Sequence, residues 1–119
     1  MNRLVLFAAL LGFTGVAFGA FGAHALDAQL TEESRGWWNT ATLYVLPHAA
    51  AALAAGLSGR GQQMALGGWL LACGALVFAA TLYAMSLGAP RWLGAVTPLG
   101  GLGMLAGWAV LALSAARKS

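Results

Sequence analysis

Residues Leu4–Leu26 decide the fold: the stretch reads LVLFAALLGFTGVAFGAFGAHAL and contains no acidic residue, lysine or arginine. At about 1.5 Å per residue, a helix of this length crosses a hydrocarbon core of about 30 Å. Three similar stretches follow, and the predicted spans cover residues 4–26, 37–57, 64–87 and 98–116. We therefore predict an all-α integral membrane protein, with four transmembrane helices in an antiparallel bundle with short loops. The spans use most of residues 1–119, which indicates a single transmembrane domain.

The composition agrees with membrane insertion. Hydrophobic residues make up 61% of the chain and charged residues 8%, whereas soluble domains carry about 25% charged residues. The net charge of +3 is spread over single basic residues and the pair Arg117-Lys118, which argues against a nucleic-acid partner. Cys73 is the only cysteine, so no disulfide forms within the chain.

The basic residues flank the predicted spans unequally and predict the orientation. An even number of spans puts both termini on one side with Arg3, Arg60, Arg117 and Lys118, whereas the other side has Arg35 and Arg91. The positive-inside rule then predicts a multi-pass membrane protein with cytoplasmic N- and C-termini. The three acidic residues, Asp27, Glu32 and Glu33, face outward in this arrangement.

The tryptophans fit the same frame as aromatic belts at the two membrane boundaries. We expect Trp37, Trp38 and Trp92 at the outer boundary, and Trp69 and Trp108 near the inner ends of their spans.

Two helix starts have capping signals. Thr31 is expected to cap the second long helix, with Glu32 and Glu33 in its first turn, where the helix dipole favours anions. Thr97-Pro98 reads as an N-cap followed by proline at the first helical position.

Small residues recur at spacings of three and four on two of the predicted helices and predict close helix packing. In lipid, such stripes let backbones approach and gain van der Waals contact; a smooth passage for a small solute is the alternative. Because a four-helix bundle need not hide both stripes, we expect one of them to support self-association or a membrane-protein partner. The helix-packing glycines are Gly12, Gly15, Gly19, Gly22, Gly100, Gly103 and Gly107.

Polar residues inside the spans provide the candidate site. Thr40, Tyr44 and His48 lie on one face of the second helix, and His48 is the titratable group nearest to mid-membrane. Thr81 and Tyr83 of the third span are plausible neighbours. An intramembrane ionisable residue is a functional-site hypothesis by default, yet histidine, tyrosine and threonine also connect helices through hydrogen bonds. We favour the connecting role and keep a ligand or proton site as the alternative.

His24 lies at the outer end of the first span, where it reads as an interfacial polar residue. A shared metal or haem site with His48 is not expected, because His48 lies more than about 10 Å deeper and no acid or cysteine stands at matching depth. We therefore predict no metal and no cofactor.

Several short motifs resemble those of the domain-of-unknown-function 423 family, and they extend over nearly the whole chain. The motifs are Gly19-Ala20-Phe21-Gly22-Ala23-His24, Tyr44 with His48, Leu82-Tyr83, Thr97-Pro98-Leu99-Gly100-Gly101 and Gly107-Trp108. The resemblance implies a small four-span membrane protein of the bacterial inner membrane, or its mitochondrial relative, with no assigned activity.

Three function classes remain open. We favour a structural or accessory membrane protein that acts through helix packing in the lipid bilayer, alone or in a complex. The alternatives are a small-solute or proton transporter or channel, and a lipid- or quinone-binding protein that uses Tyr44 and His48. An enzyme is not expected, because the histidine has no partner nucleophile or metal cluster in the sequence.

Overall fold

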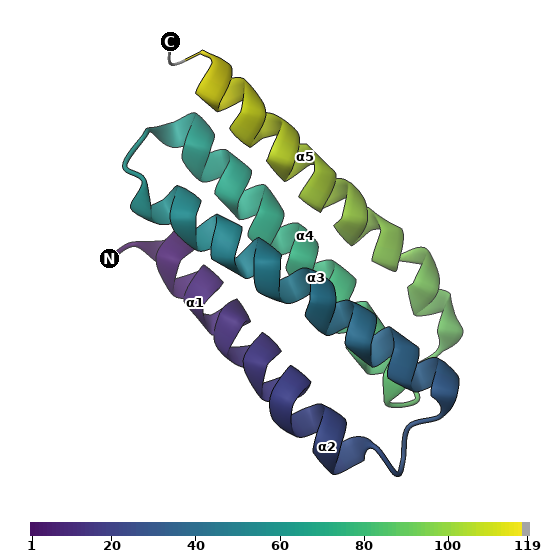
Figure 1. Cartoon of the computed structure of the whole chain (residues 1–119). Coiled ribbons are helices and arrows are strands. Elements are labelled where there is room, and N and C mark those ends of the chain that lie inside the picture. Colours follow the sequence, from purple (N-terminus) through teal and green to yellow (C-terminus); the bar gives the residue numbers. More distant parts are fainter. Residues whose placement is uncertain (118–119) are drawn as a thin grey trace.

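The computed structural model describes residues 1–117, which form helices joined by short loops (Figure 1). The first span is continuous but changes its winding twice, from an α-helix through a π-helix and back. The elements are α1 (Arg3–Val16), the π-helix η1 (Ala17–Gly22), α2 (Ala23–Leu26), α3 (Glu32–Leu57), α4 (Gln62–Ser86), the 3₁₀ helix η2 (Arg91–Ala95) and α5 (Thr97–Ala116).

Within the described residues, four helical segments are long and apolar enough to cross a membrane. They have 24, 26, 25 and 26 residues, or about 36–39 Å at 1.5 Å per residue. This length exceeds the hydrocarbon core of about 30 Å, so the helix ends reach into the headgroup regions. The predicted fold class is confirmed.

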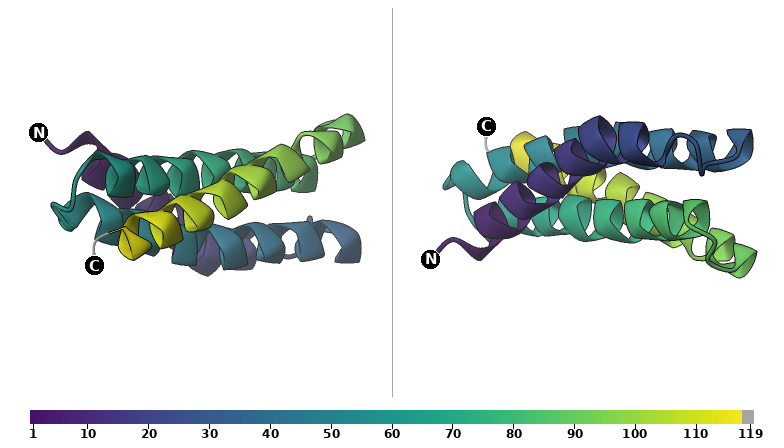
Figure 2. Two further views of the ribbon diagram at one scale, coloured as in Figure 1. Left: turned by 90° about the horizontal axis from the view of Figure 1, so that it is seen from above. Right: turned by 90° about the horizontal axis from the view of Figure 1, so that it is seen from below.

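The helices pack in chain order, each antiparallel to the one before it. The α1 helix packs on α3, α3 on α4, and α4 on α5, while α1 also touches the edge of α4. Figure 2 shows α3 and α4 running side by side and α5 crossing obliquely. Both chain ends and the α3–α4 loop lie at one end of the bundle, which we call the terminal end, and the other two connections lie at the opposite end (Figure 1).

Small side chains fill the middle of the bundle. Leu71 is the largest fully buried residue, and Ala41, Ala52, Ala72 and Ala75 have no exposed surface. Because these side chains are short, neighbouring helices approach closely, as is common where lipid gives no hydrophobic driving force for association.

The glycines of the first span lie against α3. A Cβ atom built on Gly15 would come 2.9 Å from Val45, and one on Gly22 would come 2.5 Å from the ring of Trp38. Gly19 likewise meets Thr42, at 2.7 Å. Gly12 is looser, since its added Cβ would make only an ordinary contact of 3.9 Å.

The glycines of α5 lie against α4. A Cβ on Gly100 would come 2.5 Å from the backbone nitrogen of Phe78, and one on Gly107 would come 2.7 Å from Leu71. Gly103 meets the backbone of Gly74 in the same way, at 3.1 Å. Both glycine faces are therefore covered inside the chain, and the expectation that one of them is left for a partner is wrong.

One of the two predicted caps is present. The Thr31 side chain accepts a hydrogen bond from the Ser34 backbone at 3.0 Å, with Glu32 and Glu33 in the first turn of α3. Thr97 instead is the first residue of α5, and its side chain does not cap the helix. Its hydroxyl donates to the Leu93 carbonyl at 3.1 Å, so the predicted cap at Thr97 is wrong.

The charges separate between the two ends of the bundle. At the end away from the termini, Arg35 pairs with Asp27 at 2.9 Å and Arg91 pairs with Glu33. The Arg91 guanidinium also lies over the ring of Trp37, 5.3 Å from its centroid. All three acidic residues of the chain lie in the α2–α3 loop or the first turn of α3, so the terminal end has no carboxylate side chain.

Candidate functional site

The imidazole of His48 joins α3 to α5. Its Nε2 accepts a hydrogen bond from the indole Nε1 of Trp108 at 3.0 Å, and its Nδ1 lies 2.7 Å from the backbone carbonyl of Tyr44. An indole N–H only donates and a carbonyl only accepts. The two partners therefore select the neutral imidazole with its proton on Nδ1, because a doubly protonated ring would lose the bond from Trp108.

Tyr44 lies one turn before His48 and stacks on it, with ring centroids 6.2 Å apart. Its other side meets Phe78 of α4 at 4.9 Å. The residue is 42% exposed. Among residues 1–117 the Tyr44 hydroxyl has no hydrogen-bond partner; the bond at this residue uses its backbone carbonyl.

These side chains line a groove of about 680 Å³ between α3 and α5, with α4 as its floor. The groove, which we call the α3–α5 groove, is open toward the lipid and is mostly apolar. Its polar atoms belong to the Tyr44–His48–Trp108 group. The lining residues are Tyr44, His48, Phe78, Pro98, Gly101, Leu102, Met104, Leu105 and Trp108.

Tyr83 belongs to a separate cluster on the other side of α3. Its hydroxyl shares a hydrogen bond of 2.6 Å with Thr42, and its ring makes edge contacts with Trp38 and Phe18. The Trp38 indole donates to the Phe18 carbonyl in the π-helix at 2.8 Å. That carbonyl also accepts from the backbone of Ala23. The cluster therefore fixes the π-helical segment against α3.

Thr81 also lies away from His48. Its hydroxyl shares a hydrogen bond of 2.6 Å with Thr97 and is within 3.0 Å of the Val77 carbonyl. It thus connects α4 to the start of α5. The expectation that Thr81 and Tyr83 are polar neighbours of Tyr44 and His48 is wrong, because each has a partner of its own.

The other predicted polar residues are not part of the groove. Thr40 is half-buried one turn before Tyr44 and does not line the groove. His24 is exposed and lines a cavity of about 400 Å³ near the α2–α3 loop, together with Asp27, Arg35 and Asn39. No three metal-binding side chains gather anywhere in the described part of the chain.

Sequence reasoning missed two tryptophans of these clusters. Trp108 was expected at the inner boundary, but its indole nitrogen bonds to His48 inside the groove. Trp38 was expected in the outer belt, yet it is 2% exposed and packs in the core. A signal for Trp38 was present in the sequence, because Gly22 provides the space that a buried ring needs.

Comparison with known proteins identifies the family. A model described as "Protein of unknown function (DUF423)" matches residues 18–101, which include all of α3 and α4. The chain belongs to the DUF423 family. A DUF423 relative in Escherichia coli K12, the UPF0382 inner membrane protein YgdD, is 36% identical over 120 residues, covering 96% of this chain and 89% of the relative.

Two other relatives are also named as membrane proteins. The UPF0382 membrane protein YwdK of Bacillus subtilis is 33% identical over 122 residues and covers 98% of both chains. The UPF0382 membrane protein SERP0230 of Staphylococcus epidermidis is 35% identical over 116 residues, covering 96% of this chain and 95% of its own. No solved structure matches the chain. This DUF423 member is thus a small integral membrane protein of unknown activity.

Proposed function

We propose that this DUF423 protein is a non-catalytic membrane protein that binds one lipid-soluble molecule in the α3–α5 groove. The molecule has an apolar chain and a polar group that accepts or donates a hydrogen bond at Tyr44. The observation that carries the proposal is Tyr44, which lines the groove near the middle of α3 and whose hydroxyl has no hydrogen-bond partner in the described chain.

The energetics of hydrocarbon support a ligand at this hydroxyl. An unpaired hydroxyl transferred from water to an apolar medium costs a few kcal/mol, about 1–3 by protein mutational data. The hydroxyls of Thr42, Thr81 and Tyr83, which also lie within the spans, have partners inside the chain. A polar group of a bound molecule would give Tyr44 the partner that the fold does not provide.

The size of the groove also suits a small molecule. Binding sites for ligands of drug or cofactor size have volumes of about 300–1,000 Å³ and mostly apolar walls with a few polar groups. The α3–α5 groove has about 680 Å³ and one polar group of three residues. Its opening toward lipid gives a hydrophobic molecule direct access from the bilayer.

The contacts of His48 argue against the transporter alternative in its proton-carrying form. A proton relay alternates between two protonation states, and only the neutral state of His48 satisfies both Trp108 and the Tyr44 carbonyl. We infer that His48 holds α5 at the correct distance from α3 and so shapes the groove. It is a positioning residue, and Tyr44 is the residue that contacts the ligand.

The predicted self-association remains part of the proposal, but it needs a surface other than the glycine faces. We infer that a second copy or a membrane partner would contact the outward side of the first span, where Phe13 of α1 and Phe21 of η1 are exposed. Native mass spectrometry reports the assembly size directly. Wild-type dimers or larger assemblies, together with a monomeric Phe13→Ala, Phe21→Ala double variant, would support this surface. A monomeric wild-type protein would reject it.

Ligand binding can be tested with a groove-filling variant. Leu102 lines the groove on α5 and is exposed, so a Leu102→Trp substitution blocks the groove without disturbing the core. Leu113→Trp is the matched control, since Leu113 is an exposed leucine of the same helix outside the groove. After gentle extraction, native mass spectrometry should find a retained molecule on wild type and Leu113→Trp, and little on Leu102→Trp. Equal retention by all three would reject the groove as the binding site.

The orientation is proposed as the sequence predicts it, with both termini in the cytoplasm. The carboxylate-free terminal end and the paired charges at the other end support this direction under the positive-inside rule. A single-cysteine protein, Cys73→Ala with Ser58→Cys, tests it in intact cells. An impermeant thiol reagent should leave Ser58→Cys unlabelled until the membrane is opened, and labelling from outside would reverse the orientation.

A further inference from the structure

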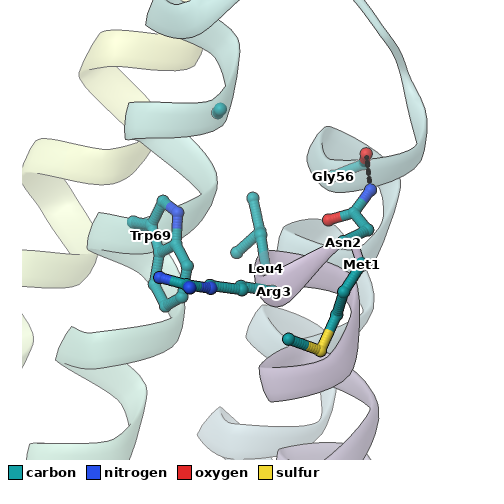
Figure 3. Close-up of a pocket in the computed structure, with 7 residues that line it drawn as sticks. Met1, Asn2, Arg3, Leu4, Gly56 and Trp69 are labelled. Carbon is teal, nitrogen blue, oxygen red and sulfur yellow. Dashed lines mark hydrogen bonds between the residues drawn. The ribbon is translucent and has the colours of Figure 1, made fainter.

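A second cavity lies at the terminal end of the bundle, away from the α3–α5 groove. It has a volume of about 700 Å³ and lies between the start of α1, the end of α3 and the first turns of α4. Figure 3 shows the residues that surround it, among them Met1, Asn2, Arg3, Gly56 and Trp69.

The wall between α1 and α3 is fixed by Asn2. Its side-chain nitrogen donates to the Gly56 carbonyl at 2.9 Å, and its side-chain oxygen accepts from the Val5 backbone at 3.1 Å. The opposite wall is Trp69, whose ring stacks on Phe7 of α1 with centroids 5.6 Å apart. The cavity is thus held from both sides by contacts within the chain.

Arg3 supplies an unbalanced positive charge to this cavity. Within residues 1–117, Arg35 and Arg91 each form an ion pair with a carboxylate, whereas Arg3 forms none. Met1 lines the same cavity, and no carboxylate side chain lies at this end. Figure 3 shows the Arg3 side chain reaching from α1 toward Trp69.

We propose that this cavity binds the phosphate headgroup of an anionic phospholipid. Arg3 would contact the phosphate, and Asn2 would keep α1 and α3 in place around it. The indole of Trp69 has the amphipathic character of side chains that lie at headgroup depth. The apolar surface of Phe7 and Trp69 continues from the cavity toward the hydrocarbon, which suits an acyl chain and favours a lipid over free phosphate.

The test compares an anionic with a zwitterionic phospholipid. Purified protein in mild detergent is titrated with phosphatidylglycerol or with phosphatidylcholine of the same acyl chains, and binding is followed by the rise of the thermal midpoint. We expect phosphatidylglycerol to stabilise the protein at lower concentration than phosphatidylcholine. Equal responses to both lipids would overturn the proposal.

Two arginine variants assign the effect to the cavity. Arg3→Gln should weaken phosphatidylglycerol binding about fivefold, the effect of one basic residue near an anionic lipid surface, and Arg3→Lys should restore most of it. Arg117→Gln is the control, because Arg117 has the same charge but does not line the cavity. An equal loss in Arg117→Gln would show attraction by net charge alone and overturn the site.

A final arm separates lipid from free phosphate, and the lipid-free protein provides a folding control. Sodium phosphate at the concentration of the lipid should not change the thermal midpoint. A rise in the thermal midpoint that depends on Arg3 would mean that the cavity binds inorganic phosphate instead. The lipid-free thermal midpoint of Arg3→Gln should match wild type, because Arg3 is exposed and makes no ion pair in the described chain. A lowered midpoint would mean that Arg3 is structural and would overturn its role as a free cation for the lipid.

Discussion

Substitution of Gly100 by alanine tests the close contact between α4 and α5. The added Cβ would lie 2.5 Å from the Phe78 nitrogen, 2.6 Å from the Gly74 oxygen and 2.9 Å from the Phe78 Cα. All three atoms belong to the backbone of α4, so no side-chain rotation relieves the clash. The two helices would have to move apart along the contact that fixes α5.

Gly101 provides a matched control on the next residue of the same helix. A Cβ added there would meet nothing within 4 Å. Both substitutions gain the same helix propensity, worth about 0.5–1 kcal/mol, so this contribution cancels in the difference between the variants. Overpacking costs about 1–3 kcal/mol, and we expect a difference near the upper end, about 3 kcal/mol, because the atoms that clash are backbone.

The assay is reversible unfolding in mixed micelles, with the helix content and tryptophan fluorescence followed as denaturing detergent is added. Gly100→Ala should unfold at a lower fraction of denaturing detergent than wild type, and Gly101→Ala at the same fraction or a higher one. If Gly100→Ala is as stable as Gly101→Ala, α4 and α5 do not approach each other at this point and the packing described above is incorrect.

Three further predictions follow from the polar contacts. His48→Leu should destabilise the protein by about 1–3 kcal/mol because the Trp108 indole loses its acceptor, whereas His48→Gln should cost less; equal losses in unfolding experiments would contradict the connecting role. Trp38→Phe removes the indole hydrogen bond to the Phe18 carbonyl and should lower the free energy of unfolding by about 1 kcal/mol beyond the effect of the smaller side chain. The loss is modest because the same carbonyl keeps its backbone donor, Ala23. An unchanged free energy of unfolding would show that the indole bond contributes nothing. Asp27→Asn should change the free energy of unfolding by less than about 1 kcal/mol, because the ion pair with Arg35 is exposed; a larger loss would mean that the α2–α3 loop controls folding.

The membrane-spanning helices were predictable because few other structures accommodate a charge-free apolar stretch long enough to cross a membrane. The second helix nevertheless begins at Glu32, five residues before the predicted span, because its cap at Thr31 lies outside the hydrocarbon region. The thickness of the bilayer sets the length of the apolar stretch, but it does not set the length of the helix. Hydropathy therefore predicts a crossing better than it predicts a helix end.

The site was only partly predictable. The spacing of Tyr44 and His48 places them on one face of a helix, and the two rings do stack. The same spacing does not say which helix lies opposite, so the partner Trp108, 60 residues later, had no local signal. Thr81 and Tyr83 were assigned to the wrong cluster for the same reason. The π-helix at Ala17–Gly22 also escaped prediction, and the Trp38 indole that bonds to its Phe18 carbonyl lies on another helix, a contact that local spacing does not indicate.

The Tyr44 hydroxyl is proposed to form a hydrogen bond with a bound molecule, and a pair of tyrosine variants tests this most directly. Retained small molecules are quantified per protein by mass spectrometry, and stability is measured on the same samples after the ligand has been washed out. Tyr44→Phe should retain about two- to tenfold less ligand, the effect of one hydrogen bond of about 0.5–1.5 kcal/mol, with unchanged ligand-free stability. Tyr83→Phe should show the opposite pattern, because it loses its bond to Thr42 but lies outside the groove. Wild-type ligand retention by Tyr44→Phe would contradict the proposed function.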